Sequence, residues 1–188
     1  MIVNDLNLYL FQQINASSTS NTLLNHVAIF FSHTLSVLFI VFILALLFFQ
    51  GKSYRSLFFK TLFMIVLTLL IEDFIELLYY HPRPFELDLG VKLIDHGATS
   101  SFPSSHTLTI STLAFSFLMG GYKKIGIVGL LFSVLVGWSR VYLGVHFPFD
   151  ILGSLMIAYL VVVLSHSFFE NFVYRIHRYS QFKVADLP

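Results

Sequence analysis

The sequence predicts an all-α integral membrane protein, a bundle of about five transmembrane helices preceded by an interfacial amphipathic helix. The 188 residues are 56% hydrophobic and only 11% charged, with a mean hydropathy of +0.80, against roughly 25% charged residues in an ordinary soluble domain. Five apolar stretches are long enough to cross the hydrocarbon core as helices, which takes about 20 residues each. This composition excludes a soluble globular protein, a disordered chain and a nucleic-acid-binding protein.

The elements follow in chain order. Before the first span, apolar residues recur at helical spacing between polar ones, so we expect residues 1–21 to form an amphipathic helix at the membrane interface. These apolar positions are Ile2, Val3, Leu6, Leu10 and Ile14. The five predicted spans are residues 23–50, 56–80, 104–121, 125–143 and 149–172. The chain is thus one membrane-embedded domain of residues 1–188, with a helical bundle over 22–172 and a tail over 173–188.

Basic residues are distributed unevenly between the two faces of this bundle. Eight of the eleven Lys and Arg residues fall in three segments that five spans place on the same face. These residues are Lys52, Arg55, Lys60, Lys123, Lys124, Arg175, Arg178 and Lys183. The positive-inside rule puts that face, and with it the tail, in the cytoplasm.

Three polar stretches interrupt the apolar pattern at the outer ends of the spans. They are residues 81–84 (HPRP), 101–106 (SFPSSH) and 139–150 (SRVYLGVHFPFD). The first two bound the one long connection, and long loops in compact proteins are usually functional or mobile. The topology brings all three stretches to one membrane surface. Because the chain has no cysteine, a thiol nucleophile and a thiolate metal site are excluded.

Two features of these stretches suit a phosphate. Pro103 followed by Ser104 and Ser105 indicates a helix start with a serine N-cap, and the free backbone N–H groups there form an anion site. Arg83 and Arg140 carry forked donors suited to bidentate phosphate contacts. Together these groups would hold a phosphate without a metal, and we predict neither a metal nor a cofactor.

Two histidines complete the pattern. Pro148 suits the first turn of the last span, so His146 lies just before that helix and Asp150 within its first turn. A carboxylate in this position can hydrogen-bond one ring nitrogen and leave the other as a nucleophile. His106, in the first turn of the third span, is then available to protonate the leaving oxygen. A nucleophile, its orienting group, an acid and an anion clamp make up a catalytic site.

These residues resemble the motifs of the type 2 phosphatidic acid phosphatase superfamily, K-x6-R-P, P-S-G-H and S-R-x5-H-x3-D. The third motif is matched in full, by Ser139, Arg140, His146 and Asp150. The second is matched by Pro103, Ser104 and His106, with Ser105 in place of the glycine. The first is matched only by Arg83 and Pro84, because Glu76 occupies the lysine position. The resemblance covers about residues 70–170.

The resemblance implies an enzyme that works through a phosphohistidine. His146 would attack the terminal phosphorus, Asp150 would orient it, and His106 would act as acid and then as base for water. The phosphate oxygens would be bound by Arg83, Ser104, Ser105 and Arg140. Family members generally need no metal.

A narrower resemblance is to the small bacterial undecaprenyl-diphosphate phosphatases associated with bacitracin resistance. Short length, an outward-facing site, a P-R-P-F sequence, here residues 82–85, and an absent first lysine go together in that branch. It implies hydrolysis of undecaprenyl diphosphate at the outer face of a bacterial plasma membrane, in carrier-lipid recycling for cell-wall synthesis. The implied partners are the lipid diphosphate and membrane lipids, with no nucleic acid, and the oligomeric state is left open.

Two other functions fit the same residues. One is a phosphatase of lipid monophosphates, such as phosphatidic acid or phosphatidylglycerol phosphate. The other, from a different class, is a transporter or lipid-binding membrane protein that uses the arginines to recognise a headgroup without any chemistry.

An acidic cluster near the outer end of the second span has three interpretations. Glu72, Asp73 and Glu76 could pair with one of the site arginines, which we favour, could bind a divalent cation, or could handle protons.

The other histidines carry weaker signals. We expect His26, His33 and His166 to be packed or hydrogen-bonded residues, because the sequence offers each no partner at helical spacing beyond ordinary hydroxyls. His81 and His96 lie in the outer loop, and either could border the headgroup site.

Overall fold

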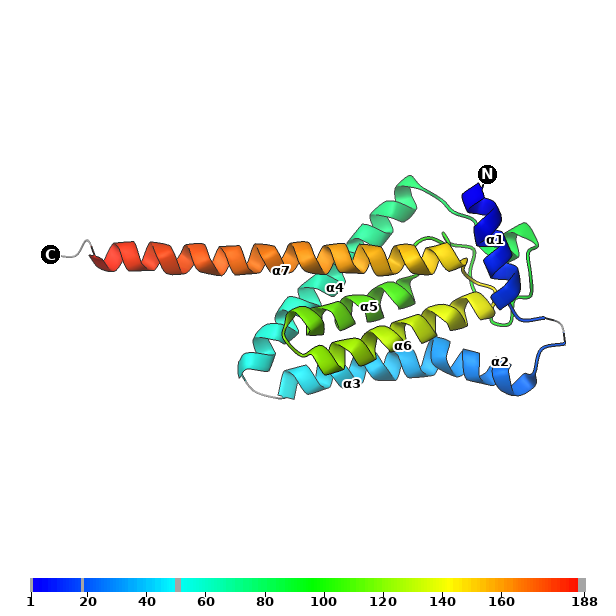
Figure 1. The fold of residues 1–188 in the computed structure, drawn as a ribbon, viewed down its shortest axis with the longest axis horizontal. Coiled ribbons are helices and arrows are strands. Elements are labelled where there is room, and N and C mark those ends of the chain that lie inside the picture. The colour runs from blue at the N-terminus through cyan, green and yellow to red at the C-terminus, as the bar shows by residue number, and fades with distance from the viewer. Residues whose placement is uncertain (1, 18, 50–51, 186–188) are drawn as a thin grey trace.

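The computed structural model of the protein describes residues 2–17, 19–49 and 52–185. Within these residues every regular element is a helix (Figure 1), which confirms the predicted all-α class. The elements are α1 (Ile2–Ile14), α2 (Thr22–Ile29), the π-helical turn η1 (Phe30–Leu35), α3 (Ser36–Phe49), α4 (Lys52–Leu78), the 3₁₀ turn η2 (Pro84–Leu87), α5 (Ser105–Met119), α6 (Lys123–Tyr142) and α7 (Pro148–Ala185).

The helices correspond closely to the predicted spans. The first span is built from α2, η1 and α3 in succession, and α4 to α7 supply the other four. The helix α7 continues past the predicted span to Ala185, so most of the predicted tail is helical, and residues 186–188 lie outside the described part of the chain. In Figure 1, α7 projects well beyond the other helices at one end of the bundle.

The five helical segments differ in how well each could cross a membrane alone. Within the described part of the chain, three stretches are long and apolar enough, namely Thr22–Ala45, Lys123–Tyr142 and Pro148–Asn171. The helix α4 carries charged residues near both ends, and α5 has only 15 residues, about 22 Å of helix. Because α5 packs against α4, α6 and α7, it is the inner helix of the bundle and owes little of its stability to contact with lipid.

The N-terminal helix α1 lies across the ends of α6 and α7 (Figure 1). Its Phe11 is fully buried and packs with Val141, Phe147 and Ile151. Of the predicted apolar positions, Ile14 packs against this cluster, whereas Leu6 is exposed. The buried face of α1 is therefore centred on Phe11, which the predicted pattern did not include.

Asn15, just after α1, connects three parts of the chain. Its side-chain amide donates to the backbone oxygens of Val91 and Tyr142, both at 3.0 Å, and its oxygen accepts from the Val91 N–H at 2.7 Å. Nearby, Gly144 has a φ of 77°, and a Cβ there would lie 2.2 Å from the Val91 oxygen. Only glycine fits this turn, which leads directly to His146.

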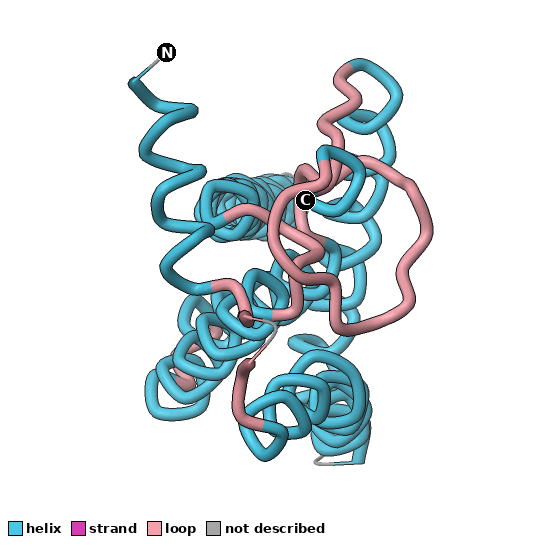
Figure 2. Tube along the Cα trace, turned by 90° about the vertical axis from the view of Figure 1, so that its right-hand side faces the viewer, coloured by secondary structure: helices cyan, strands magenta, loops and turns pink. Residues whose placement is uncertain are grey.

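The long connection between α4 and α5 covers this same end of the bundle. Figure 2 looks at this end and shows the connection spread across the helix ends. Backbone contacts attach it to its surroundings, because Ser101 N–H donates to the His81 oxygen at 2.6 Å and Leu93 N–H to the Leu143 oxygen at 3.1 Å. The loop is therefore held in place over the ends of α4 and α6.

We expect Asn15→Ala to destabilise the protein by about 2–4 kcal/mol, because three hydrogen bonds are lost and the loop backbone groups are left unpaired. Thermal unfolding of the purified protein in detergent measures this. Asn21→Ala is the matched control, since the Asn21 side chain accepts one hydrogen bond, from Leu23 N–H at an exposed helix start, among the described residues, a contact worth about 1 kcal/mol. Equal losses in the two variants would show that Asn15 does not secure the loop.

Candidate active site

His146 lies in the turn between α6 and α7 and is 2% exposed. Its Nδ1 is 2.7 Å from the backbone oxygen of Ser101, and its Nε2 is 3.2 Å from Nη1 of Arg83. Because a carbonyl oxygen only accepts and a guanidinium only donates, Nδ1 carries the proton and Nε2 presents its lone pair. The surroundings thus fix one tautomer of a neutral imidazole.

Asp150 does not hydrogen-bond His146 directly, which corrects the predicted contact. Its Oδ2 is 3.7 Å from Nδ1 of His146, and it accepts instead from Ser101 Oγ at 2.5 Å and from Phe147 N–H at 2.7 Å. The reason is its place three residues after Phe147, where an acidic side chain bonds back to the start of its own helix. Asp150 therefore acts on the imidazole through Ser101, whose carbonyl accepts the Nδ1 proton.

Arg83 is 4% exposed, and all five of its N–H donors have partners. The acceptors are the Thr99 oxygen, Thr99 Oγ1, the Ser100 oxygen, the Val145 oxygen and His146 Nε2, at 2.8–3.2 Å. The predicted bidentate phosphate clamp is therefore not available at Arg83 in this structure. Its guanidinium fastens the long loop to the turn that carries His146, and one donor points at the His146 nitrogen with the lone pair.

Arg140, in the last turn of α6, is 3% exposed and has donors to spare. Its Nη1 donates to Ser32 Oγ at 2.8 Å, a hydroxyl supplied by the π-helical turn η1. Its Nε has no hydrogen-bond partner among the described residues. A buried guanidinium with an unused donor suits an oxyanion, so of the two predicted arginines Arg140 is the better placed to bind phosphate.

The second motif forms the first turn of α5, as predicted. Ser104 is the N-cap residue, and its N–H donates to Ser154 Oγ at 2.8 Å. Ser105 Oγ donates to a carboxylate oxygen of Glu72. His106 is partly buried, and its electrostatic neighbours include Arg140 and His146. The predicted acid is thus on the same side of the bundle as the predicted nucleophile, His146.

The acidic cluster makes contacts that the sequence did not indicate. Glu76 accepts from Ser100 N–H at 2.8 Å, Glu72 accepts from Ser105, and Asp73 is exposed. No ion pair between these carboxylates and an arginine occurs among the described residues, so the favoured interpretation was wrong. The described part of the chain also contains no group of three or more His, Cys, Asp or Glu side chains able to hold a metal ion. These glutamates anchor the loop and the start of α5.

His81 and His96, whose roles the sequence left open, both border the site. The rings of His96 and His146 are 6.4 Å apart in an edge-to-face arrangement, and His81 Nδ1 is 3.4 Å from Asp150 Oδ1. Thr99 and Ser100, which bind Arg83, were missed by the motif analysis. Their position directly before the second motif, in an otherwise apolar chain, was the available signal.

Burial lowers the pKa of His146 to about 4. The nearby negative charge of Asp150 opposes this shift, while the positive charges of Arg140 and Arg83 add to it. Desolvation disfavours the charged imidazole and so keeps it neutral. At neutral pH the Nε2 lone pair is therefore free of a proton.

A family model described as the PAP2 superfamily matches residues 57–174. The chain belongs to the PAP2 superfamily. Among PAP2 relatives, the putative undecaprenyl-diphosphatase YbjG of Escherichia coli is 34% identical over 82% of this chain and 78% of that protein. The undecaprenyl-diphosphatase BcrC of Bacillus subtilis is 31% identical over 87% and 84%.

Solved structures of similar proteins agree with the fold. LpxE of Aquifex aeolicus has a TM-score of 0.72 and 26% identity, over 85% of this chain and 94% of that one. A transmembrane PAP2-type phosphatidylglycerolphosphate phosphatase from Bacillus subtilis has a TM-score of 0.63 and 25% identity, over 90% and 87%. The protein is a multi-pass membrane phosphatase of the PAP2 type, as the motifs predicted.

The depressed pKa of His146 predicts acid sensitivity. Its ordinary pKa is 6.5, so between pH 6.5 and about 4 the unfolded chain binds a proton that the folded chain does not. The contribution of His146 to the free energy of unfolding is at its full value above pH 6.5. It declines as the pH falls, by about 2 kcal/mol between pH 7.5 and 5. Thermal unfolding across this pH range measures the decline.

The control for this measurement is His146→Gln, which keeps a polar side chain of similar length but cannot titrate. Between pH 7.5 and 5, the free energy of unfolding of this variant should fall by about 2 kcal/mol less than that of the wild type. Parallel pH profiles for the two proteins would contradict the assigned burial effect.

Proposed function

We propose that the protein removes the terminal phosphate from undecaprenyl diphosphate, yielding undecaprenyl phosphate and inorganic phosphate. The observation that carries this proposal is the neutral, buried His146, with Nδ1 protonated toward Ser101 and Nε2 presenting a lone pair. The choice of lipid is supported by the names of two relatives that match most of this chain, both described as undecaprenyl-diphosphatases.

In the first step, Nε2 of His146 attacks the terminal phosphorus. The bond between that phosphorus and the bridging oxygen breaks, and His106 donates a proton to the leaving lipid phosphate. The Arg83 donor that faces Nε2 in the free enzyme moves to a phosphate oxygen as the new bond forms. The phosphorylated imidazole is positive, and the carboxylate of Asp150, 3.7 Å from Nδ1, stabilises it.

In the second step, water attacks the phosphohistidine. His106, now neutral, takes a proton from this water, inorganic phosphate leaves, and Nε2 regains its lone pair. Arg140 and the start of α5 at Ser104 and Ser105 bind the phosphate oxygens through both steps. The Nε–H of Arg140, which has no partner among the described residues, stabilises the charge that builds up there, and the N–H groups in the first turn of α5 add to it. No metal is required by this scheme.

The site would act on the outer face of a bacterial plasma membrane. The support is the distribution of basic residues, eight of which lie at the opposite end of the spans from His146. The headgroup would enter from the membrane surface, and the isoprenoid chain would lie along apolar helix faces. The product would return to carrier-lipid recycling for cell-wall synthesis.

The substrate test compares phosphate release from undecaprenyl diphosphate with release from phosphatidic acid and phosphatidylglycerol phosphate. We expect the diphosphate to have the higher kcat/KM by about tenfold or more, which is about 1.4 kcal/mol in transition-state free energy. Purified enzyme is assayed in detergent, with His146→Ala as the inactive blank. A tenfold preference for a monophosphate would favour the second candidate, which the structural likeness to a phosphatidylglycerolphosphate phosphatase supports.

Replacing Arg83 should mainly lower stability, whereas replacing Arg140 should mainly lower activity. Arg83→Met breaks five hydrogen bonds and should lower stability by about 3–5 kcal/mol, measured by thermal unfolding. Arg140→Met loses one described hydrogen bond and should unfold near the wild-type temperature, yet lose about 10³-fold in kcat/KM. The opposite pattern, an inactive but stable Arg83 variant and an unfolded Arg140 variant, would reverse the assigned roles.

A further inference from the structure

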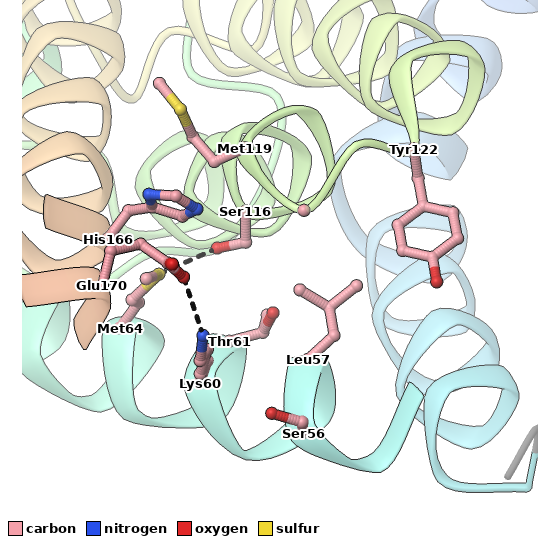
Figure 3. Close-up of a pocket in the computed structure, with 11 residues that line it drawn as sticks. Ser56, Leu57, Lys60, Thr61, Met64, Ser116, Met119, Tyr122, His166 and Glu170 are labelled. Atoms are coloured by element: carbon pink, nitrogen blue, oxygen red, sulfur yellow. Dashed lines mark hydrogen bonds and ion pairs between the residues drawn. The ribbon is translucent and has the colours of Figure 1, made fainter. Parts of the chain in front are cut away.

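A cavity of about 310 Å³ lies at the C-terminal end of α5, the opposite end of the bundle from His146. Figure 3 shows the side chains that line it. It forms between α4 and α7 where α5 ends, at Met119 and Gly120. Since α5 is short and both neighbours continue past it, the space that another turn of α5 would fill is left open. The active site does not use this cavity.

The cavity wall combines both signs of charge. Lys60 on α4 and Glu170 on α7 form an ion pair across it, with Nζ and Oε1 3.4 Å apart. His166, which we expected to be a packed residue, also lines it, one helical turn before Glu170. Figure 3 shows the Lys60 and Glu170 side chains meeting between the two helices.

One buried hydroxyl in the wall has no hydrogen-bond partner in the part of the chain that the structure describes. Thr61 is fully buried, lines the cavity, and its Oγ1 makes no hydrogen bond among the described residues. An unsatisfied buried hydroxyl destabilises a protein, so a Thr at this position is best explained by a polar ligand that reaches it from the cavity.

The cavity sits where the apolar part of the bundle ends. The apolar stretch of α7 runs from Pro148 to Asn171, so Glu170 is at its boundary. Aromatic side chains lie beside the ion pair, because Lys60 Nζ is 5.7 Å from the ring centre of Phe169 on α7, and that ring packs edge-to-face with Phe63 on α4. A ligand with a polar head and acyl chains would meet suitable groups in both regions.

We propose that this cavity binds the headgroup of a zwitterionic aminophospholipid. The lipid phosphate contacts Lys60 and the Thr61 hydroxyl, and the ammonium group donates to Glu170. A lipid with phosphate as its only charged group would suit the cavity less, because Glu170 would lie beside a second negative charge. The volume is at the lower end for ligand sites, about 300 Å³ upwards, which fits a headgroup.

Native mass spectrometry of the purified protein tests this with phosphatidylethanolamine, phosphatidylglycerol and phosphatidylcholine that carry identical acyl chains. We expect phosphatidylethanolamine to bind about tenfold more tightly than either of the others. Phosphatidylcholine should be weaker because its methylated ammonium cannot donate a hydrogen bond to Glu170. Equal binding of all three lipids by the wild-type protein would overturn the proposal.

Variants locate the binding. Lys60→Met and Glu170→Gln should each remove the preference for phosphatidylethanolamine, and the nearly isosteric Thr61→Val should weaken its binding by about threefold. Lys124→Met, which removes an exposed charge at the same end of the bundle, should leave binding unchanged. Release of phosphate by each variant shows that the variant is folded. This control does not depend on which lipid phosphate the enzyme prefers as its substrate. A preference that persists in both charge variants would place the lipid elsewhere and refute the site.

Discussion

The hydrogen bond from His146 Nδ1 to the Ser101 carbonyl, 2.7 Å long, is the contact on which the rest of the site depends. It selects the tautomer in which Nε2 presents its lone pair, as the proposed nucleophile must. Ser101 is in turn held by Asp150 and by the His81 carbonyl. A buried polar network of this kind is stable only when its members are satisfied, which explains why so many loop groups converge on this one residue.

Much of this arrangement could be predicted from the sequence. Charged residues are few, so those at span ends in 81–84, 101–106 and 139–150 indicated a function, and topology alone predicted that they meet. The spans followed from apolar length, and the starts of α5 and α7 from Ser104 and Pro148. These signals are local in the chain or follow from the order of the helices.

Side-chain partners could not be predicted in the same way. Spacing placed Asp150 one turn from His146, yet the carboxylate bonds to Phe147 N–H and Ser101, because its geometry in the first turn of α7 favours those donors. Arg83 was expected to face substrate, but its partners lie 16 to 63 residues away along the chain. Glu76 and Glu72 likewise accept from distant groups, the Ser100 N–H and the Ser105 hydroxyl. Contacts between distant segments depend on how the loop packs, which a motif does not encode.

Direct trapping of the phosphorylated enzyme tests the central claim about His146. The purified protein is mixed with lipid diphosphate labelled in its terminal phosphate and quenched in alkali, under which phosphohistidine survives. The account predicts a label on His146 in the wild type and none in His146→Gln. Full phosphate release without any labelled histidine, or a label that persists in His146→Gln, would contradict it.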